Sequence, residues 1–133
     1  MKKIYLSIAA LNGLIGTGAS ALAAHALPGD RLSKTTQWFI QGAEFQLIHA
    51  ITLMIIAVWM QMALSSRTHK TLRASYILMQ GGIIAFSGTL YWIGVKGAGT
   101  LGAFHWVTPT GGLLLMLGWT GLIVTGLTYK KED

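Results

Sequence analysis

The sequence predicts an all-α polytopic membrane protein, a single bundle of four transmembrane helices with both ends of the chain in the cytoplasm. The chain of 133 residues has only 10 Lys or Arg and 4 Asp or Glu, which is 11% charged, compared with roughly 25% in a soluble domain. Hydrophobic residues make up 53% of the chain, and the mean hydropathy is +0.56. The remaining polar surface could not cover a water-soluble globule of this size. These observations exclude a soluble enzyme, a disordered tail and a collagen-like fibre.

Four apolar runs give the predicted spans, at about 4–26, 38–62, 74–95 and 106–129 of a single domain, 1–133. The first run, Ile4 to His25, contains no charged residue and would form a helix of about 33 Å, long enough to cross a bilayer. The second run is broken by one carboxylate, Glu44. Outer-membrane strands are about ten residues long and alternate in polarity, so these longer, uniformly apolar segments are predicted to be helices.

The predicted helix ends follow from local signals. Ser33 is expected to be the N-cap of a helix that continues into the second span, after a turn at Pro28-Gly29-Asp30. Thr108 is expected to be an N-cap of the fourth helix, with Pro109 in its first turn.

The distribution of basic residues predicts the orientation. With four spans, seven basic residues fall on the side of the termini: Lys2, Lys3, Arg67, Lys70, Arg73, Lys130 and Lys131. Three fall on the other side: Arg31, Lys34 and Lys96. The positive-inside rule therefore places both termini in the cytoplasm. Of the nine Trp and Tyr residues, only Trp119 lies in the middle of a span, as expected when these side chains favour the headgroup level.

The N-terminal run has an alternative interpretation as a secretory signal peptide. Lys2 and Lys3 precede the apolar stretch, and Ala21-Leu22-Ala23 or Ala24-His25-Ala26 resembles a cleavage site. The length of the run and its Asn12 favour a membrane span.

Small residues on the first span predict close helix packing. Ala9, Gly13, Thr17, Ala21 and His25 recur at four-residue spacing, and Gly16, Ser20 and Ala24 form an adjacent stripe. Small residues allow helices in a bilayer to approach closely. We therefore expect the first helix to be central, with packing contacts at Gly13, Gly16, Thr17, Ser20 and Ala21.

Two ionisable residues of the second span are candidate functional groups, because ionisable groups are costly inside a membrane. Glu44 lies about 9 Å and His49 about 16 Å beyond Trp38 along a helix, and they are about 140° apart around its axis. With His25 they could form a proton-responsive or ligand-binding cluster. Alternatively, they make hydrogen bonds between helices and fix the packing, which a four-helix bundle needs in any case.

Other chemistry has little support in the sequence. The chain has no Cys, and it contains no HExxH, GxSxG or Walker motif, so no enzymatic activity is expected. We expect no cofactor and no metal: His25 and His49 differ too much in depth to ligate one haem, and no HxxxH or ExxH spacing supports a site from His25, His105 and Glu44. The basic stretch Arg67 to Arg73, with a solvated His69, is expected to be a cytoplasmic loop that binds no nucleic acid.

Four motifs along the chain resemble those of a known family. They are Ala23-Ala24-His25-Ala26-Leu27, Gln41-Gly42-Ala43-Glu44-Phe45-Gln46 with His49-Ala50, Ser87-Gly88-Thr89-Leu90-Tyr91, and Val107-Thr108-Pro109-Thr110-Gly111-Gly112. Their order and spacing resemble the YgdD-like small inner-membrane proteins, which share a domain of unknown function. The resemblance implies a multi-pass protein of the cell inner membrane and supplies no reaction.

On the predicted topology all four motifs fall in the outer half of the bundle. We therefore expect an outward-facing polar pocket, lined by His25, Gln41, Glu44, His49, Ser87, Tyr91 and Thr108. Such a pocket could bind a small ligand or lipid, or serve as the interface for a membrane protein partner or another copy in a homo-oligomer. The alternatives are a proton-linked small-solute transporter, which with four spans would need to be a dimer, and an accessory subunit of a membrane redox enzyme.

Overall fold

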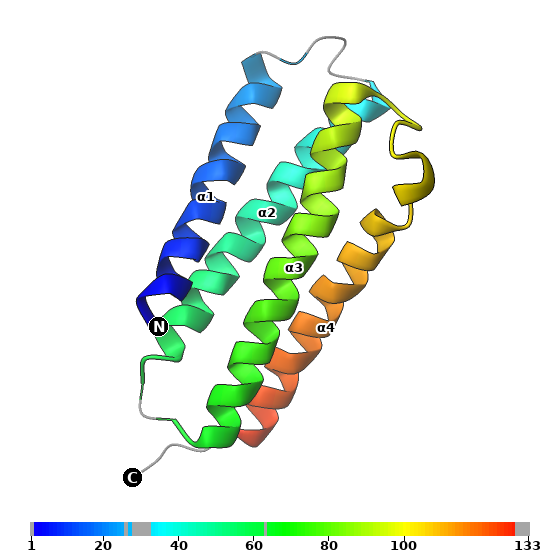
Figure 1. Ribbon diagram of the computed structural model, residues 1–133. Coiled ribbons are helices and arrows are strands. Elements are labelled where there is room, and N and C mark those ends of the chain that lie inside the picture. The colour runs from blue at the N-terminus through cyan, green and yellow to red at the C-terminus, as the bar shows by residue number, and fades with distance from the viewer. Residues whose placement is uncertain (1, 26, 28–32, 63, 130–133) are drawn as a thin grey trace.

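In the computed structural model, the protein consists of four long antiparallel helices and one short 3₁₀ helix (Figure 1). The structure describes residues 2–25, 27, 33–62 and 64–129. The elements are α1 (Lys2–His25), α2 (Lys34–Trp59), α3 (Ser66–Lys96), η1 (Gly102–Phe104) and α4 (Val107–Thr128). Each of the four α-helices is long and apolar enough to cross a membrane. The predicted all-α, four-span fold is confirmed.

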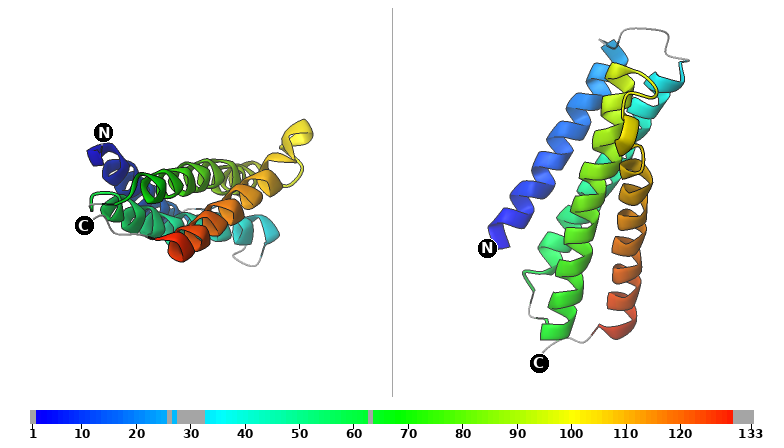
Figure 2. Two further views of the ribbon diagram at one scale, coloured as in Figure 1. Left: turned by 90° about the horizontal axis from the view of Figure 1, so that it is seen from below. Right: turned by 45° about the vertical axis from the view of Figure 1, so that its right-hand side comes forward.

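The helices pack in chain order, α1 on α2, α2 on α3 and α3 on α4. The central pair is α2 and α3, with α1 and α4 on opposite sides of it (Figures 1 and 2). The first helix was expected to be central; it is peripheral instead, and α2 is the most buried span. The first turn of α1 and the last turn of α4 lie at one end of the bundle, here called the Lys3 end, and the opposite end is called the His25 end.

The ends of α2 and α3 show how the sequence sets helix limits. The Ser33 side chain caps α2 by accepting a hydrogen bond from the Thr36 backbone N–H, as expected. Ser65 caps α3 in the same way through Thr68. The basic stretch that was expected to be a loop therefore forms the first turns of α3. With 31 residues, α3 is about 46 Å long, more than the hydrocarbon thickness of about 30 Å.

The connection between α3 and α4 depends on three glycines. Gly97, Gly99 and Gly102 have φ angles of 104°, 78° and 53°, a region that side chains with a Cβ rarely adopt. α4 then begins at Val107 with Trp106 as its N-cap, without a side-chain capping hydrogen bond. The expected cap, Thr108, is instead inside the helix. The turn expected at Pro28 to Asp30 falls outside the described residues.

The hydrophobic core lies towards the Lys3 end, between all four helices. Its buried members come mainly from the last half of α2, the connection that follows it and α3 up to Ile83, with Ala9 from α1 and Leu115 from α4. They include Leu53, Ile56, Met60, Leu72, Tyr76 and Met79. The largest described hollow lies at the opposite, His25 end.

Each helix interface has a close approach at a glycine. A Cβ on Gly16 would lie 2.9 Å from Leu47 Cγ of α2, and one on Gly42 would lie 3.1 Å from Leu90 Cβ of α3. A Cβ on Gly111 would collide with the backbone of Phe86. These positions let the helix backbones come close together.

The packing face of α1 differs from the expected set. Gly16 is in contact with Leu47 as expected, and Ser20 is half-buried, but Thr17 and Ala21 are exposed and a Cβ on Gly13 would meet no atom within 4 Å. The buried positions are Ala9, Asn12, Gly16 and Ala23. The buried face of α1 is therefore rotated about the helix axis, by about one residue position, from the face that the sequence predicts. The physical reason is Asn12, whose polar amide is turned into the bundle.

Candidate functional site

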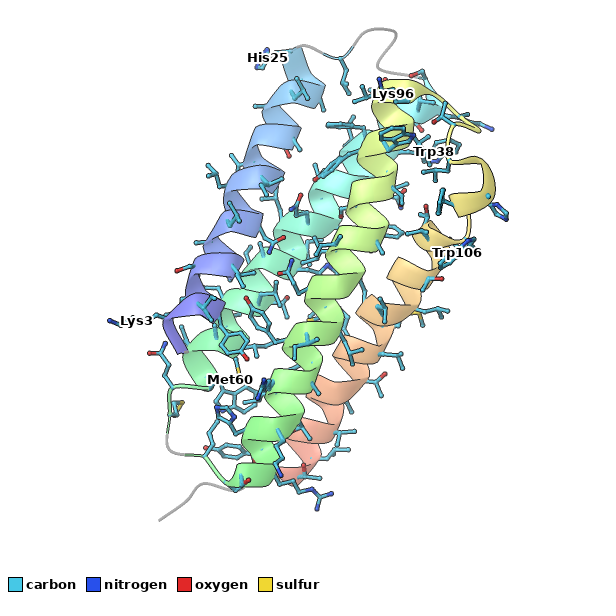
Figure 3. The ribbon with its side chains drawn as sticks, viewed as in Figure 1. Lys3, His25, Trp38, Met60, Lys96 and Trp106 are labelled. Atoms are coloured by element: carbon cyan, nitrogen blue, oxygen red, sulfur yellow. The ribbon has the colours of Figure 1, made fainter. Side chains whose placement is uncertain are left out.

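A hollow of about 460 Å³ opens at the His25 end, between α2, α3, the start of α4 and the connection that precedes α4. Its walls are mostly apolar, and its described lining is Trp38, Gln41, Phe86, Leu90, Ile93, Ala98, Gly99, Leu101, Gly102, His105 and Thr108. Figure 3 shows Trp38 beside this connection, near Lys96. The glycine-rich connection, which must turn back over the helix ends, forms one wall.

Three polar side chains line the hollow, and they differ in how far their hydrogen-bonding capacity is used. The Thr108 hydroxyl donates to Thr89 Oγ1 at 2.7 Å, which ties α4 to α3. His105 Nδ1 lies 3.0 Å from the Gly102 carbonyl oxygen. Within the described chain, the exposed Gln41 amide and His105 Nε2 have no hydrogen-bond partner. They are therefore available to donate hydrogen bonds to a molecule in the hollow and to accept hydrogen bonds from it.

A chain of hydrogen bonds joins α1, α2 and α3 in the bundle interior. Asn12 Nδ2 donates to Gln80 Oε1 at 2.8 Å and to the Ile8 carbonyl at 3.0 Å. Gln46 Nε2 donates to Asn12 Oδ1 at 3.1 Å, and the Tyr91 hydroxyl donates to Gln46 Oε1 at 2.6 Å. Asn12 and Gln46 are each only 5% exposed. The predicted site residue Tyr91 thus takes part in helix packing.

Sequence reasoning missed this amide network, although a signal for it existed. Asn12, Gln46 and Gln80 are the amides placed well inside three different apolar runs. Amide groups in a bilayer interior need hydrogen-bond partners. The presence of one amide in each of three spans therefore predicts that the three side chains are hydrogen-bonded to one another.

His49 is buried and makes two hydrogen bonds. Its Nδ1 lies 2.7 Å from the Phe45 carbonyl oxygen, and the Trp119 indole N–H donates to its Nε2 at 3.1 Å. An indole nitrogen can only donate, so Nε2 is the acceptor and Nδ1 carries the hydrogen, a tautomer assigned from the network. This neutral imidazole has both nitrogens satisfied and links α2 to α4. It also explains Trp119, the aromatic residue that did not fit the interfacial belts.

Glu44 lies in a different environment from His49. Its side chain is exposed and lines a groove of about 310 Å³ between α1 and α2, together with Ser20, Ala23, Ala24 and Ile40. The described residues provide no hydrogen bond or ion pair to its carboxylate. Glu44 and His49 face different helices, so they do not form the single cluster that one interpretation of the sequence required.

The structure therefore divides the seven residues expected to line one pocket. Gln41 and Thr108 line the hollow, while Glu44 lines the α1–α2 groove. His49 and Tyr91 are hydrogen-bonded between helices, Ser87 is buried with an unpartnered hydroxyl, and His25 is exposed at the end of the peripheral α1. Helical periodicity explains this correction, because residues at similar depth on a helix point to different neighbours. The lining groups outside the expected set are the connection and the side chains of Trp38, Phe86, Leu90, Ile93 and His105. Over the described residues, no three potential metal ligands cluster.

The sequence motifs of α2, α3 and α4 contact one another around the hollow. Gly42 of the α2 motif packs against Ser87, Leu90 and Tyr91 of the α3 motif. Thr108 and Gly111 of the α4 motif meet the same stretch of α3 through Thr89 and Phe86. Much of the motif pattern is therefore explained by helix contacts that form the walls of the hollow.

Comparison with known proteins supports the membrane assignment. A UPF0382 membrane protein of Haemophilus influenzae is 33% identical over 131 residues, which is 98% of this chain and 99% of the relative. The Bacillus subtilis UPF0382 membrane protein YwdK is 32% identical over 127 residues, or 96% and 98% of the two chains. The Escherichia coli UPF0382 inner membrane protein YgdD is 28% identical over 130 residues, or 98% and 94%. No solved structure matches.

The model of a family described as "Protein of unknown function (DUF423)" matches residues 19–112. This stretch is more than half of the chain and includes the motif residues that surround the hollow. The four helices that are long and apolar enough to span a membrane, and the relatives named as membrane proteins, support a multi-pass membrane protein. The family match shows that the chain belongs to the DUF423 family.

Proposed function

We propose that this protein is a non-enzymatic binding protein of the cell inner membrane, and that the hollow at the His25 end receives a small amphipathic molecule. The observation that carries the proposal is the combination of a mostly apolar cavity with two polar groups, Gln41 and His105 Nε2, that no described residue satisfies. Binding sites for small molecules have this character, an apolar lining with a few polar groups that orient the ligand.

The size and position of the hollow restrict the class of ligand. A volume of about 460 Å³ is within the range of roughly 300–1,000 Å³ typical of small-molecule sites. The Gln41 amide both donates and accepts, and the acceptor at His105 requires a hydroxyl or N–H on the ligand. We therefore expect an apolar body next to Phe86 and Leu90 and a hydroxyl or amide head near Gln41 and His105.

The proposal includes the location of the protein in the inner membrane and its lack of enzymatic activity. The E. coli relative is named an inner membrane protein, and the excess of basic residues on one predicted side suits a plasma membrane. The sequence carries no catalytic motif, and the polar groups of the hollow suit hydrogen bonding to a ligand.

Native mass spectrometry of the protein released gently from its own membrane tests the proposal. We expect the wild-type protein to retain a specific molecule that differs from the bulk phospholipids. Ala98→Leu, which places a larger side chain in the wall of the hollow, should lose that molecule. Ala103→Leu makes the same change at an exposed position of η1 outside the lining and should retain it.

Two results would contradict the proposal. The wild-type protein could carry nothing beyond bulk phospholipid, or Ala98→Leu could retain the molecule as well as Ala103→Leu does. In either case the hollow is not the site of retention.

A further inference from the structure

A second, separate groove runs along the contact between α1 and α2. Its part near the His25 end is the 310 Å³ hollow that contains Glu44. Its part towards the Lys3 end has a volume of about 260 Å³ and is lined by Ala9, Ala10, Gly13, Leu47, Ala50, Ile51, Met54 and Ile55. On α2, the positions 40, 44, 47 and 51 recur at helical spacing and share one face. Both parts therefore open on the same side of the α1–α2 pair. They lie on either side of the contact between Gly16 and Leu47, and together they are called the α1–α2 groove.

The two parts of this groove differ in chemistry. The part near Gly13 and Ile51 is apolar, as its lining shows. The other part carries Glu44, the sole acidic residue of the sequence between Asp30 and Glu132. Glu44 lies about 9 Å beyond Trp38 along α2, and side chains on a helix tilt towards its N-terminus. The carboxylate is therefore directed towards the headgroup region at the His25 end.

A cationic or hydrogen-bonding partner would stabilise an exposed carboxylate at this depth, because ionisable groups within a span are costly when unpaired. The described residues provide none. The described basic side chains at this end are His25, Lys34, Lys96 and His105. The first three are at or near helix termini, and His105 lines the separate hollow beside α3 and α4. A second copy related by an axis normal to the membrane would keep its Lys34 about 15 Å along the helix from the depth of Glu44. The membrane itself contains the required combination of a cationic head and an apolar chain.

We propose that the α1–α2 groove binds one phospholipid with a primary ammonium headgroup, whose ammonium pairs with Glu44 and whose acyl chain lies in the part lined by Gly13 and Ile51. A primary ammonium donates up to three hydrogen bonds and forms a charge-assisted bond to a carboxylate. A quaternary ammonium has no N–H to donate, and an anionic headgroup is repelled. The groove thus selects an ethanolamine headgroup over choline and glycerol headgroups. This site is distinct from the hollow beside Trp38 and does not depend on its ligand.

The headgroup part of the proposal is tested by native mass spectrometry of delipidated protein with an equimolar mixture of phosphatidylethanolamine, phosphatidylcholine and phosphatidylglycerol of identical acyl chains. We expect ethanolamine-lipid adducts to exceed choline-lipid adducts by about tenfold, which is close to the lower limit for one hydrogen bond to a charged group. Glu44→Gln should reduce this ratio to about one. Glu132→Gln removes the same charge in the tail that follows α4 and should leave the ratio unchanged.

The acyl-chain part is tested with two glycines of α1. A Cβ on Gly13 or on Gly18 would meet no atom within 4 Å, so both positions accept a side chain without a clash. Gly13 lines the groove, whereas Gly18 is exposed outside its described lining. Gly13→Leu should lower the adducts of all three lipids while preserving their ratio. Gly18→Leu should change neither.

Three results would overturn the proposal. The first is equal binding of the three lipids by the wild-type protein, and the second is an ethanolamine preference that survives in Glu44→Gln. The third is a dimer that is lost in Gly13→Leu, which would assign the groove to a second copy of the chain. Because Ala98→Leu changes the hollow beside Trp38 and leaves the α1–α2 groove intact, failure of the ligand proposal for that hollow is distinguishable from failure of this one.

Discussion

Gln46 illustrates how single polar residues organise the bundle. Its amide donates to Asn12 of α1 and accepts from Tyr91 of α3, so one side chain of α2 holds both neighbours. Interhelical hydrogen bonds in membranes contribute only about 0.6 kcal/mol on average. A buried amide that loses its partner costs more, roughly 1–3 kcal/mol, because no water replaces the lost bond. The amide network therefore affects stability mainly because its disruption leaves buried polar groups without hydrogen-bond partners.

Gln46→Leu is expected to lower the free energy of unfolding by roughly 1–3 kcal/mol, since it leaves both Asn12 Oδ1 and the Tyr91 hydroxyl unpaired. Unfolding in mixed micelles of rising denaturing-detergent content, followed by circular dichroism, measures this change. Gln41→Leu is the matched control five residues earlier in α2, where the side chain is exposed, and should change stability by less than about 0.5 kcal/mol. Equal effects at the two positions would show that the network does not stabilise the fold.

The contact between α3 and α4 shows what determines the buried face of a helix that has no distinct apolar face. α4 is apolar on nearly every side, so amphipathicity cannot select the face that meets α3. Small residues select it instead: Gly111 lies against the backbone of Ala85 and Phe86, and Gly118 lies against Met79. Thr108 adds a hydrogen bond to Thr89 near the start of α4.

Gly111→Ala is expected to destabilise the bundle by about 1–3 kcal/mol, because the added methyl group overlaps backbone atoms that cannot rotate away. The adjacent Gly112→Ala is the control. Its Cβ would lie 3.8 Å from Phe86 Cδ2, an ordinary van der Waals distance. Detergent unfolding of the two variants checks the prediction, and a Gly111→Ala protein as stable as Gly112→Ala would refute the close-contact explanation.

The limits of sequence-based prediction also follow from these elements. Span number and approximate length were predictable, since hydropathy and the Ser33 cap are local properties. The rotation of α1 was not, because it depends on Asn12 meeting Gln46 and Gln80 from other helices. Likewise, Gln41 and Thr108 were identified as pocket residues, whereas the wall formed by the 97–106 connection depends on glycine backbone angles and on how α4 packs.

At the scale of the whole molecule, the two ends of the bundle differ in charge. The first turn of α1, the start of α3 and the end of α4 share the Lys3 end (Figure 1). In the sequence, the segments assigned to that side carry seven basic residues against three for the opposite side. The positive-inside rule applies to short loops and tails such as these. We therefore predict that the Lys3 end faces the cytoplasm.

The absence of Cys in the sequence allows this orientation to be tested with single introduced cysteines. Ala103 in η1 and Ser66 at the start of α3 are both exposed, at opposite ends of the bundle. In spheroplasts, a membrane-impermeant maleimide should label the Ala103→Cys variant. It should label the Ser66→Cys variant only after the inner membrane is opened. Both sites are exposed, so a difference between them reports sidedness. The reverse labelling pattern would place the basic end outside, and the hollow and the Glu44 groove would then face the cytoplasmic leaflet.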